Sequence, residues 1–308
     1  MSDPVVLHRP VPEHRVRSLL VVALVAALLF AVVYAVAVRT AWGQRLDATA
    51  LEGRARIDRP RVARATDGLL TTISVGSVAL IGGGIVLVAL GRGRFHLAVA
   101  AGLVVFGSDL SAEVLKRVLL TRPGLIGPDP HGWANSFPSG HTTVATSLAL
   151  AAILVTPRRA RGLVAVVGVA YALAIGEAVV VSGHHRPSDV IGSYLLVLVW
   201  ATVAAAWLAA AHARLVRTRA DDDAPAPLVS PVVAAFGAAA LAVSFVGMAV
   251  VVTALRADRL DALDLTTAFL AASAAILGTS VLVVTVFVFL LRGLSLDPPA
   301  PAPATRAA

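Results

Sequence analysis

Residues 135–156 read NSFPSGHTTVATSLALAAILVT, in which a polar Pro-Ser-Gly-His sequence runs directly into an apolar segment. As a helix, the apolar segment 142–156 would reach only about 22 Å, short of the roughly 30 Å hydrocarbon core of a bilayer. We therefore expect the helix to begin near Pro138 and the polar sequence to lie at the depth of the lipid headgroups. Free N–H groups, a hydroxyl and the positive end of the helix dipole make such a helix start an anion-binding site. An ordinary N-cap is the alternative role of Ser139.

This segment is one of eight apolar runs that can cross a membrane as helices. The runs cover residues 18–38, 68–90, 95–120, 142–156, 162–182, 188–211, 229–255 and 266–291. Of the 308 residues, 58% are apolar, 14% are charged and none is cysteine, which argues against soluble globular, disordered and disulfide-stapled classes. The fold class that follows is all-α, a polytopic transmembrane helical bundle with a six-helix core and two extra C-terminal helices.

Polar stretches set the expected boundaries along the chain. Residues 221–227 form a Pro-punctuated linker, and the Pro-Ala sequence after Asp297 is typical of a disordered tail. The chain then divides into a cytoplasmic N-terminal segment 1–17, a core 18–211, a linker 212–228, two additional helices 229–291 and a tail 292–308. The Arg-rich loop 39–67 is either a lid over a site or a solvated loop. The last two helices either pack on the core or mediate homo-oligomerisation.

The formal net charge is +8, but the basic residues lie in small groups between apolar runs rather than in one continuous stripe. This pattern is typical of loop charges that set membrane topology, and it argues against nucleic acid as a partner. The basic residues divide evenly between the two sides, and the short basic loops 157–161 and 212–219 favour cytoplasmic N- and C-termini. We expect an integral, multi-pass protein of the cell membrane.

Charged residues inside apolar runs are functional candidates by default. Asp109, Glu113 and Lys116 share one helix face, and Glu177 lies in the fifth run. For Asp109 and Glu113 we favour a structural role, in which Glu113 pairs with Lys116 and the charges join helices. Lys116 is the only lysine among 26 basic residues, and its run ends close to Arg122, which indicates a specific role for it.

A second polar cluster, from Ser182 to Asp189, separates the fifth and sixth runs. Pro187 suits the first position of a helix, which places Asp189 in the first turn, four residues after His185. Asp189 can then accept a hydrogen bond from one imidazole nitrogen and leave the other as a directed nucleophile or base. A metal is not expected, because no ligand pair such as HExxH accompanies the two histidines and Asp189 is better suited to orient His185.

Two apolar runs separate the loops 121–141 and 183–187, so both loops open on the same side of the membrane. Metal-free phosphoryl transfer needs cations and N–H groups that hold phosphate, one histidine that attacks and another that protonates a leaving group. The residues that can converge to supply these groups are Lys116, Arg122, Ser139, Gly140, His141, His185, Arg186 and Asp189.

In their order between the runs, these residues resemble the three-part signature of the type 2 phosphatidic acid phosphatase superfamily, integral-membrane lipid phosphate phosphatases related to vanadium haloperoxidases. The resemblance covers about residues 18–211; Pro-Ser-Gly-His at 138–141 matches the middle motif, and His185 to Asp189 matches the end of the third. It implies that His185 attacks phosphorus to form a phosphohistidine, that Asp189 holds the His185 ring, and that His141 protonates the leaving group and later activates water. It also implies no cofactor, and phosphate binding by Lys116, Arg122, Ser139 and the Gly140 amide.

The chain departs from that signature at two places. Five residues rather than six separate Lys116 from Arg122, and Ala178 and Val179 occupy the positions of a Ser-Arg pair. Arg186 is the nearest cation that can replace the missing arginine as a phosphate ligand.

The predicted function is hydrolysis of a lipid phosphate or diphosphate on the extracytoplasmic face of the membrane. The expected partners are the bilayer and a lipid substrate of the polyprenyl diphosphate, phosphatidate or phosphatidylglycerophosphate type. The nearest alternative is a phosphotransferase that uses an acceptor other than water. From other classes, a transporter or a non-enzymatic lipid-binding relative is the alternative, although we find no internal repeat at matching offset, which a transporter predicts.

Overall fold

The computed structural model describes residues 13–56, 60–127, 135–215 and 229–292, and helices are the only regular secondary structure in these ranges. The elements are α1 (Glu13–Val33), η1 (Tyr34–Val38), α2 (Ala41–Gly53), η2 (Arg54–Arg56), α3 (Pro60–Leu70), α4 (Val75–Gly91), α5 (Phe95–Gly102), η3 (Leu103–Gly107), α6 (Ser108–Val114), η4 (Leu115–Leu119), α7 (Gly140–Val155), α8 (Arg158–Val181), α9 (Pro187–Leu215), α10 (Val229–Arg256) and α11 (Ala262–Leu290). The predicted all-α fold is confirmed.

Apolar helices make up most of the described chain. Those long enough and apolar enough to cross a membrane are Glu13–Val38, Phe95–Leu119, Arg158–Val181, Pro187–Ala211, Pro231–Arg256 and Ala262–Leu290. Two shorter apolar helices, Gly76–Gly91 and Gly140–Val155, cover the remaining predicted runs. The run predicted at 68–90 is not one continuous helix, because its uninterrupted helical part begins with α4. Residues 71–74 interrupt the helix there, and Ser74 Oγ caps α4 by accepting a hydrogen bond from Ser77 N at 3.1 Å.

The central helix of the bundle is α9, which packs against α1, α7 and α11. Two glycines allow neighbouring elements to approach it closely. A Cβ atom on Gly176 of α8 would lie 2.4 Å from Tyr194 Oη, and one on Gly192 of α9 would lie 2.4 Å from Phe137 Cε2. The first turns of α9 and the segment before α7 are therefore held tightly against each other.

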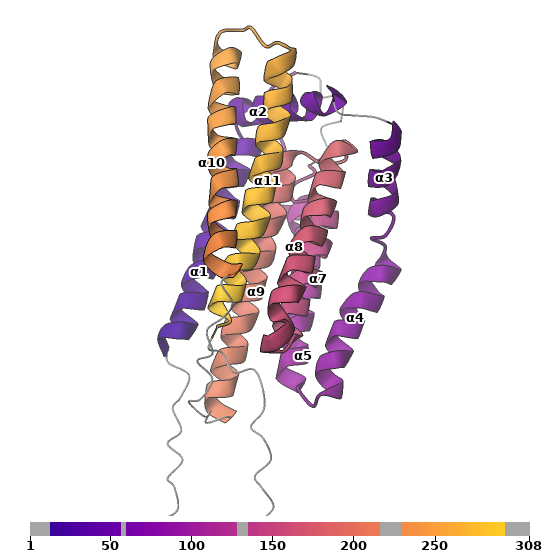
Figure 1. Ribbon diagram of the computed structural model, residues 1–308, viewed down its shortest axis with the longest axis vertical. Helices are drawn as coiled ribbons and strands as arrows, with labels where there is room; N and C mark the ends of the chain where they lie inside the picture. The colour runs from indigo at the N-terminus through magenta and orange to yellow at the C-terminus, as the bar shows by residue number, and fades with distance from the viewer. Residues whose placement is uncertain (1–12, 57–59, 128–134, 216–228, 293–308) are drawn as a thin grey trace, which may run out of the picture.

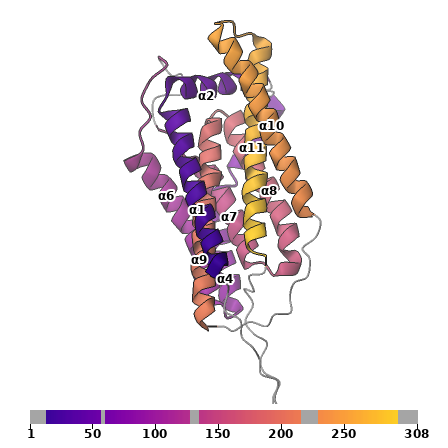
Figure 2. The same ribbon diagram turned by 90° about the vertical axis from the view of Figure 1, so that its left-hand side faces the viewer.

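The last two helices pack on the rest of the bundle. Figure 1 and Figure 2 show α10 and α11 as an adjacent pair running in opposite directions along one side of the molecule. Of this pair, α11 contacts α2, α8 and α9, and Ser273 Oγ donates a hydrogen bond to Glu177 Oε2 of α8 at 2.9 Å. Glu177 thus connects α8 and α11, while homo-oligomerisation stays a prediction.

Three arginines of the predicted cytoplasmic group gather at one end of the bundle. Arg92 Nη1 donates to the Val155 carbonyl at 3.0 Å, Arg161 Nη1 donates to the Leu291 carbonyl at 3.4 Å, and Arg15 donates to the Arg292 carbonyl. The last carbonyls of a helix have no partner within it, so these guanidinium groups complete the ends of α7 and α11.

At the opposite end, α2 lies across the bundle (Figure 1). It begins at Thr40, whose Oγ1 accepts a hydrogen bond from Gly43 N at 3.0 Å, and it packs so closely on α11 that a Cβ atom on Gly53 would lie 2.0 Å from the Leu265 carbonyl oxygen. The described part of segment 39–67 is largely helical, and α2 packs against the core, which argues against a solvated loop, one of the two alternatives; a role as a lid stays a prediction.

Several predicted segments lie partly or wholly outside the described residues. They are the first twelve residues of the N-terminal segment, most of the linker 212–228 and nearly all of the tail 292–308.

Candidate functional site

His185 and Asp189 meet where α8 ends and α9 begins. After α8, Gly183 adopts a φ of +75°, a left-handed conformation that glycine accepts readily, and His185 N donates to the Val179 carbonyl at 3.0 Å. Pro187 then starts α9, as expected, and Asp189 falls in its first turn. His185 Nδ1 lies 3.2 Å from Asp189 Oδ2. This contact directs the other ring nitrogen, Nε2, away from the carboxylate.

The Asp189 carboxylate is wholly buried and has two further donors. Its Oδ2 atom accepts hydrogen bonds from Ser136 Oγ at 2.7 Å and from Arg186 N at 3.0 Å. Arg186 is also buried, and its Nη1 atom donates to Ser136 Oγ at 3.2 Å. The Arg186 side chain therefore contacts Ser136, in the segment before α7. Ser136 and the Arg186 backbone both donate to Asp189.

The Pro-Ser-Gly-His sequence forms the start of α7. Ser139 is buried and acts as the N-cap, because its Oγ accepts hydrogen bonds from Thr142 N at 3.4 Å and Thr142 Oγ1 at 3.1 Å. Ser139 N donates to the Asp189 carbonyl at 3.1 Å, and Ser193 Oγ donates to the Ser139 carbonyl at 2.8 Å. The N-cap role that the sequence left open is thus present, and backbone contacts join the second motif directly to the third.

Lys116 lies beside the N-terminus of α7. Its Nζ atom would be 3.4 Å from a Cβ atom placed on Gly140, and it pairs with Glu113 Oε1 at 3.3 Å. Glu113 also pairs with Arg117 Nε at 2.7 Å. The predicted pair of Glu113 and Lys116 is therefore present, within the continuous helical segment of α6 and η4, and the ammonium group lies next to Gly140.

His141 is in the first turn of α7, ahead of the apolar segment 142–156. Burial is the main cause that lowers the pKa of His141 from its ordinary value, and the positive charges of His185, His184 and Lys116 lower it further. These side chains come from η4, α7 and the turn between α8 and α9, and the folded chain brings their charges to bear on His141. At neutral pH the resting site favours neutral His141.

Arg122 lies deeper than a loop residue usually does. Its side chain is 2% exposed, and Nη2 is 3.9 Å from Asp47 Oδ2 on α2. The structure therefore places this predicted phosphate ligand against a carboxylate that the sequence had shown only as one charge within an Arg-rich loop.

Three more residues contact parts of the site, and the sequence did not predict this role for them. Asn135 Nδ2 donates to the Lys116 and Leu120 carbonyls, both at 3.1 Å, which ties the end of η4 to the second motif. Arg54 Nη1 donates to the Val181 carbonyl at 3.0 Å, and a Cβ atom on Gly183 would lie 2.6 Å from Arg54 Cζ. Asp47, described above, is the third. Each contact joins positions far apart in the chain, so spacing could not indicate it.

Among the described residues, no three His, Asp or Glu side chains gather as a metal-binding group. The six long apolar helices are compatible with a multi-pass membrane protein, and His185, His141, Lys116 and the N-terminus of α7 lie together at one end of the bundle. Residues 95–213 match the PAP2 superfamily, so this part of the chain is a PAP2 superfamily domain and the predicted family is confirmed. The domain and the membrane-span-like helices indicate a membrane phosphatase family. The search of curated proteins and the search of solved structures found no match.

Proposed function

We propose that the protein hydrolyses a lipid phosphate or diphosphate at the end of the bundle where α2 lies, and that this end faces away from the cytoplasm. The observation that carries the proposal is the buried Asp189 carboxylate next to His185 Nδ1, with Lys116 and His141 in the same cluster. Apolar helices around a site at this depth suit a substrate with a hydrocarbon tail, such as phosphatidate or a polyprenyl diphosphate.

In the first step, His185 Nε2 attacks phosphorus and the bond between phosphorus and the leaving oxygen breaks. Asp189 fixes the ring and stabilises the positive charge that the imidazole acquires, while His141 gives a proton to the leaving oxygen. The Lys116 ammonium, the Gly140 amide, Arg122, Arg186 and the Ser139 hydroxyl are the proposed groups that hold the phosphate oxygens.

In the second step, water attacks the phosphohistidine. His141, now neutral, takes a proton from the water, the bond between phosphorus and Nε2 breaks, and phosphate leaves. A lowered pKa suits His141 for this base role, whereas a bound phosphate dianion favours its protonated form for the first step.

Purified protein in lipid–detergent micelles tests the proposal. We expect phosphate release from phosphatidate or a polyprenyl diphosphate in the presence of a metal chelator, and loss of that release in His185→Ala. His184→Ala is a matched control, because the neighbouring imidazole is exposed and its Nδ1 contacts Ser182 Oγ rather than Asp189. Absence of release from wild-type protein, or equal loss in both variants, would refute the proposed role of His185. Transfer of phosphate to an added lipid alcohol without free phosphate would instead identify a phosphotransferase.

A further inference from the structure

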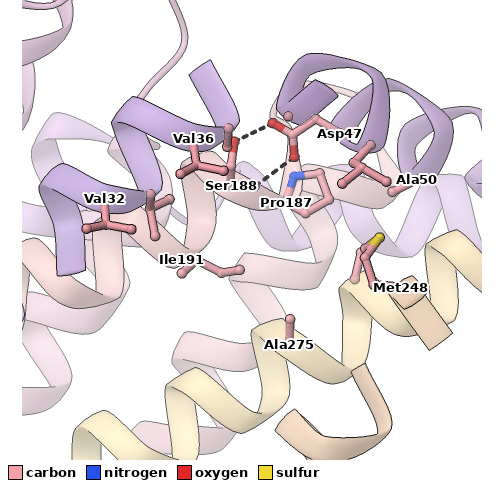
Figure 3. A pocket seen from close by; sticks show the side chains of 14 residues that line it. Val32, Val36, Asp47, Ala50, Pro187, Ser188, Ile191, Met248 and Ala275 are labelled. Carbon is pink, nitrogen blue, oxygen red and sulfur yellow. Dashed lines mark hydrogen bonds between the residues drawn. The ribbon is translucent and has the colours of Figure 1, made fainter. Parts of the chain in front are cut away.

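Asp47 is an acidic residue that α2 buries at the end of the bundle that holds the candidate site. Its side chain is 8% exposed and lines a crevice of about 310 Å³ between α1, α2, α9, α10 and α11. Figure 3 shows Asp47 and Ser188 side by side among apolar side chains, and among the described residues no other one that lines the crevice has a polar side chain. A carboxylate in such surroundings is costly unless partners compensate for the lost water.

Those partners come from two other parts of the chain. Ser188 N donates to Asp47 Oδ1 at 3.2 Å, Ser188 Oγ donates to Asp47 Oδ2, and Arg122 Nη2 lies 3.9 Å from Oδ2. Ser188 directly precedes Asp189 in the first turn of α9. One carboxylate therefore connects α2 to a predicted phosphate ligand and to the turn that carries the partner of His185.

Residues that precede Asp47 in the chain hold the loop on both sides of Arg122. Before Arg122, Tyr34 Oη donates to the Thr121 carbonyl at 2.8 Å. After it, Gln44 of α2 donates from Nε2 to the Pro123 carbonyl at 2.6 Å and accepts from Leu125 N at 3.2 Å. The backbone at Arg122 is thus fixed by neighbours of Asp47, and Asp47 itself contacts the guanidinium group.

We propose that Asp47 is a positioning residue of the phosphate site, which orients Arg122 and fixes the first turn of α9 beside Asp189. The inference rests on the proposed function, and it concerns α2, which lies outside the matched residues 95–213. An arginine held by a buried carboxylate keeps one orientation, so it binds an anion without first losing side-chain freedom.

The effect of the Asp47 charge on stability distinguishes a positioning role from a purely stabilising one. Arg122 and Asp189 are the charged groups that act on it, and Ser188 donates hydrogen bonds. Burial and then Asp189 raise the pKa of Asp47 to about 6, although Ser188 and Arg122 oppose the rise. Between its ordinary pKa and about 6 the folded protein holds more protons at Asp47 than the unfolded chain, so stability falls as the pH rises through this range. Ionised Asp47 therefore lowers the stability of the folded protein at neutral pH. Its contact with Arg122 instead holds that side chain in place in the site.

Asp47→Asn tests the proposal on the full chain in detergent, with inorganic phosphate as the probe. We expect phosphate affinity at neutral pH, measured by calorimetry, to fall about 10- to 100-fold, by analogy with the loss of an orienting partner of a metal ligand. The Tm should not fall, because the variant also removes the buried charge. Glu52→Gln removes an exposed carboxylate from the same helix and should bind phosphate as the wild type does. Ser188→Ala, which removes one donor to Asp47, should weaken binding in the same direction but less.

A double variant tests the route through Arg122. If Asp47 acts by orienting Arg122, Asp47→Asn combined with Arg122→Ala should bind phosphate about as weakly as Arg122→Ala alone. Unchanged phosphate affinity in Asp47→Asn, or a loss that adds fully to that of Arg122→Ala, would overturn the proposal. Phosphate release from a lipid substrate reports on the proposed function separately. A protein that binds phosphate in an Asp47-dependent way but releases none would refute hydrolysis and still support the positioning role.

Discussion

His185 Nδ1 lies 3.2 Å from Oδ2 of Asp189, a carboxylate that is wholly buried and also receives hydrogen bonds from Ser136 Oγ and Arg186 N. A carboxylate in this position selects the tautomer with the proton on Nδ1 and leaves the Nε2 lone pair for attack. Because Asp189 lies in the first turn of α9 and its donors come from the segment before α7 and the turn before α9, the orientation of one ring depends on three segments.

Asp189→Asn should therefore reduce turnover far more than substrate binding. An amide can donate to Nδ1 and so favour the wrong tautomer, and we expect kcat to fall by about 10²- to 10⁴-fold, the range for a misdirected acid–base group, with KM changed little. Steady-state kinetics on a lipid phosphate would measure both constants. Turnover close to that of the wild type would show that the contact does not orient a reacting histidine.

Arg186→Ala should lower turnover by about 10²-fold or more if the guanidinium contacts charge in the transition state. Arg117→Ala is the matched control, because that arginine is 77% exposed and pairs with Glu113 at the edge of the same region. Normal activity in Arg186→Ala would refute the idea that Arg186 replaces the arginine missing at Val179. A loss in Arg54→Ala instead would assign that function to the cation that lies over Gly183.

Gly183→Ala should destabilise the protein beyond the strain of the backbone alone. At a φ of +75° an L-residue adds roughly 1–2 kcal/mol of strain, and here the new Cβ atom would lie 2.6 Å from Arg54 Cζ. Gly93 isolates the backbone effect, because its φ is +69° and a Cβ atom added there would have no neighbour within 4 Å. Thermal unfolding in detergent should give a larger fall in Tm for Gly183→Ala than for Gly93→Ala. Equal falls would mean that Arg54 yields freely and does not brace the turn.

The absence of cysteine allows the orientation of the chain to be measured with single introduced thiols. Ala257 follows α10 at the end where α2 lies, and Ala160 lies at the other end near the start of α8; both are exposed. In intact cells, a membrane-impermeant maleimide should label Ala257→Cys and leave Ala160→Cys unlabelled until the membrane is opened. The reverse pattern would place the candidate site on the cytoplasmic side.

Much of the bundle follows from the sequence, because a helix in lipid must satisfy its own backbone and so leaves a long apolar run. The contact between His185 and Asp189 also follows from the sequence. Pro187 fixes where α9 starts, and the spacing of four residues places the Asp189 carboxylate beside the His185 ring. The role of α2 could not be predicted in this way. The buried face of α2 includes the polar residues Gln44 and Asp47, so the sequence pattern of this helix resembles that of a loop. The partners of Gln44 and Asp47 lie about 80 and 140 residues away in the chain. For the same reason the sequence showed only that Arg122 follows the end of an apolar run and did not indicate its contact with a carboxylate.

The proposed mechanism depends above all on covalent phosphorylation of His185 during turnover. Rapid mixing of the purified protein with a lipid phosphate carrying radiolabelled phosphorus, followed by denaturation in alkali, should trap label on the chain that acid then releases. His184→Ala should retain this label and His185→Ala should lack it. A wild-type protein that turns over substrate without labelling, or a His185→Ala variant that still becomes labelled, would contradict a phosphohistidine at this position.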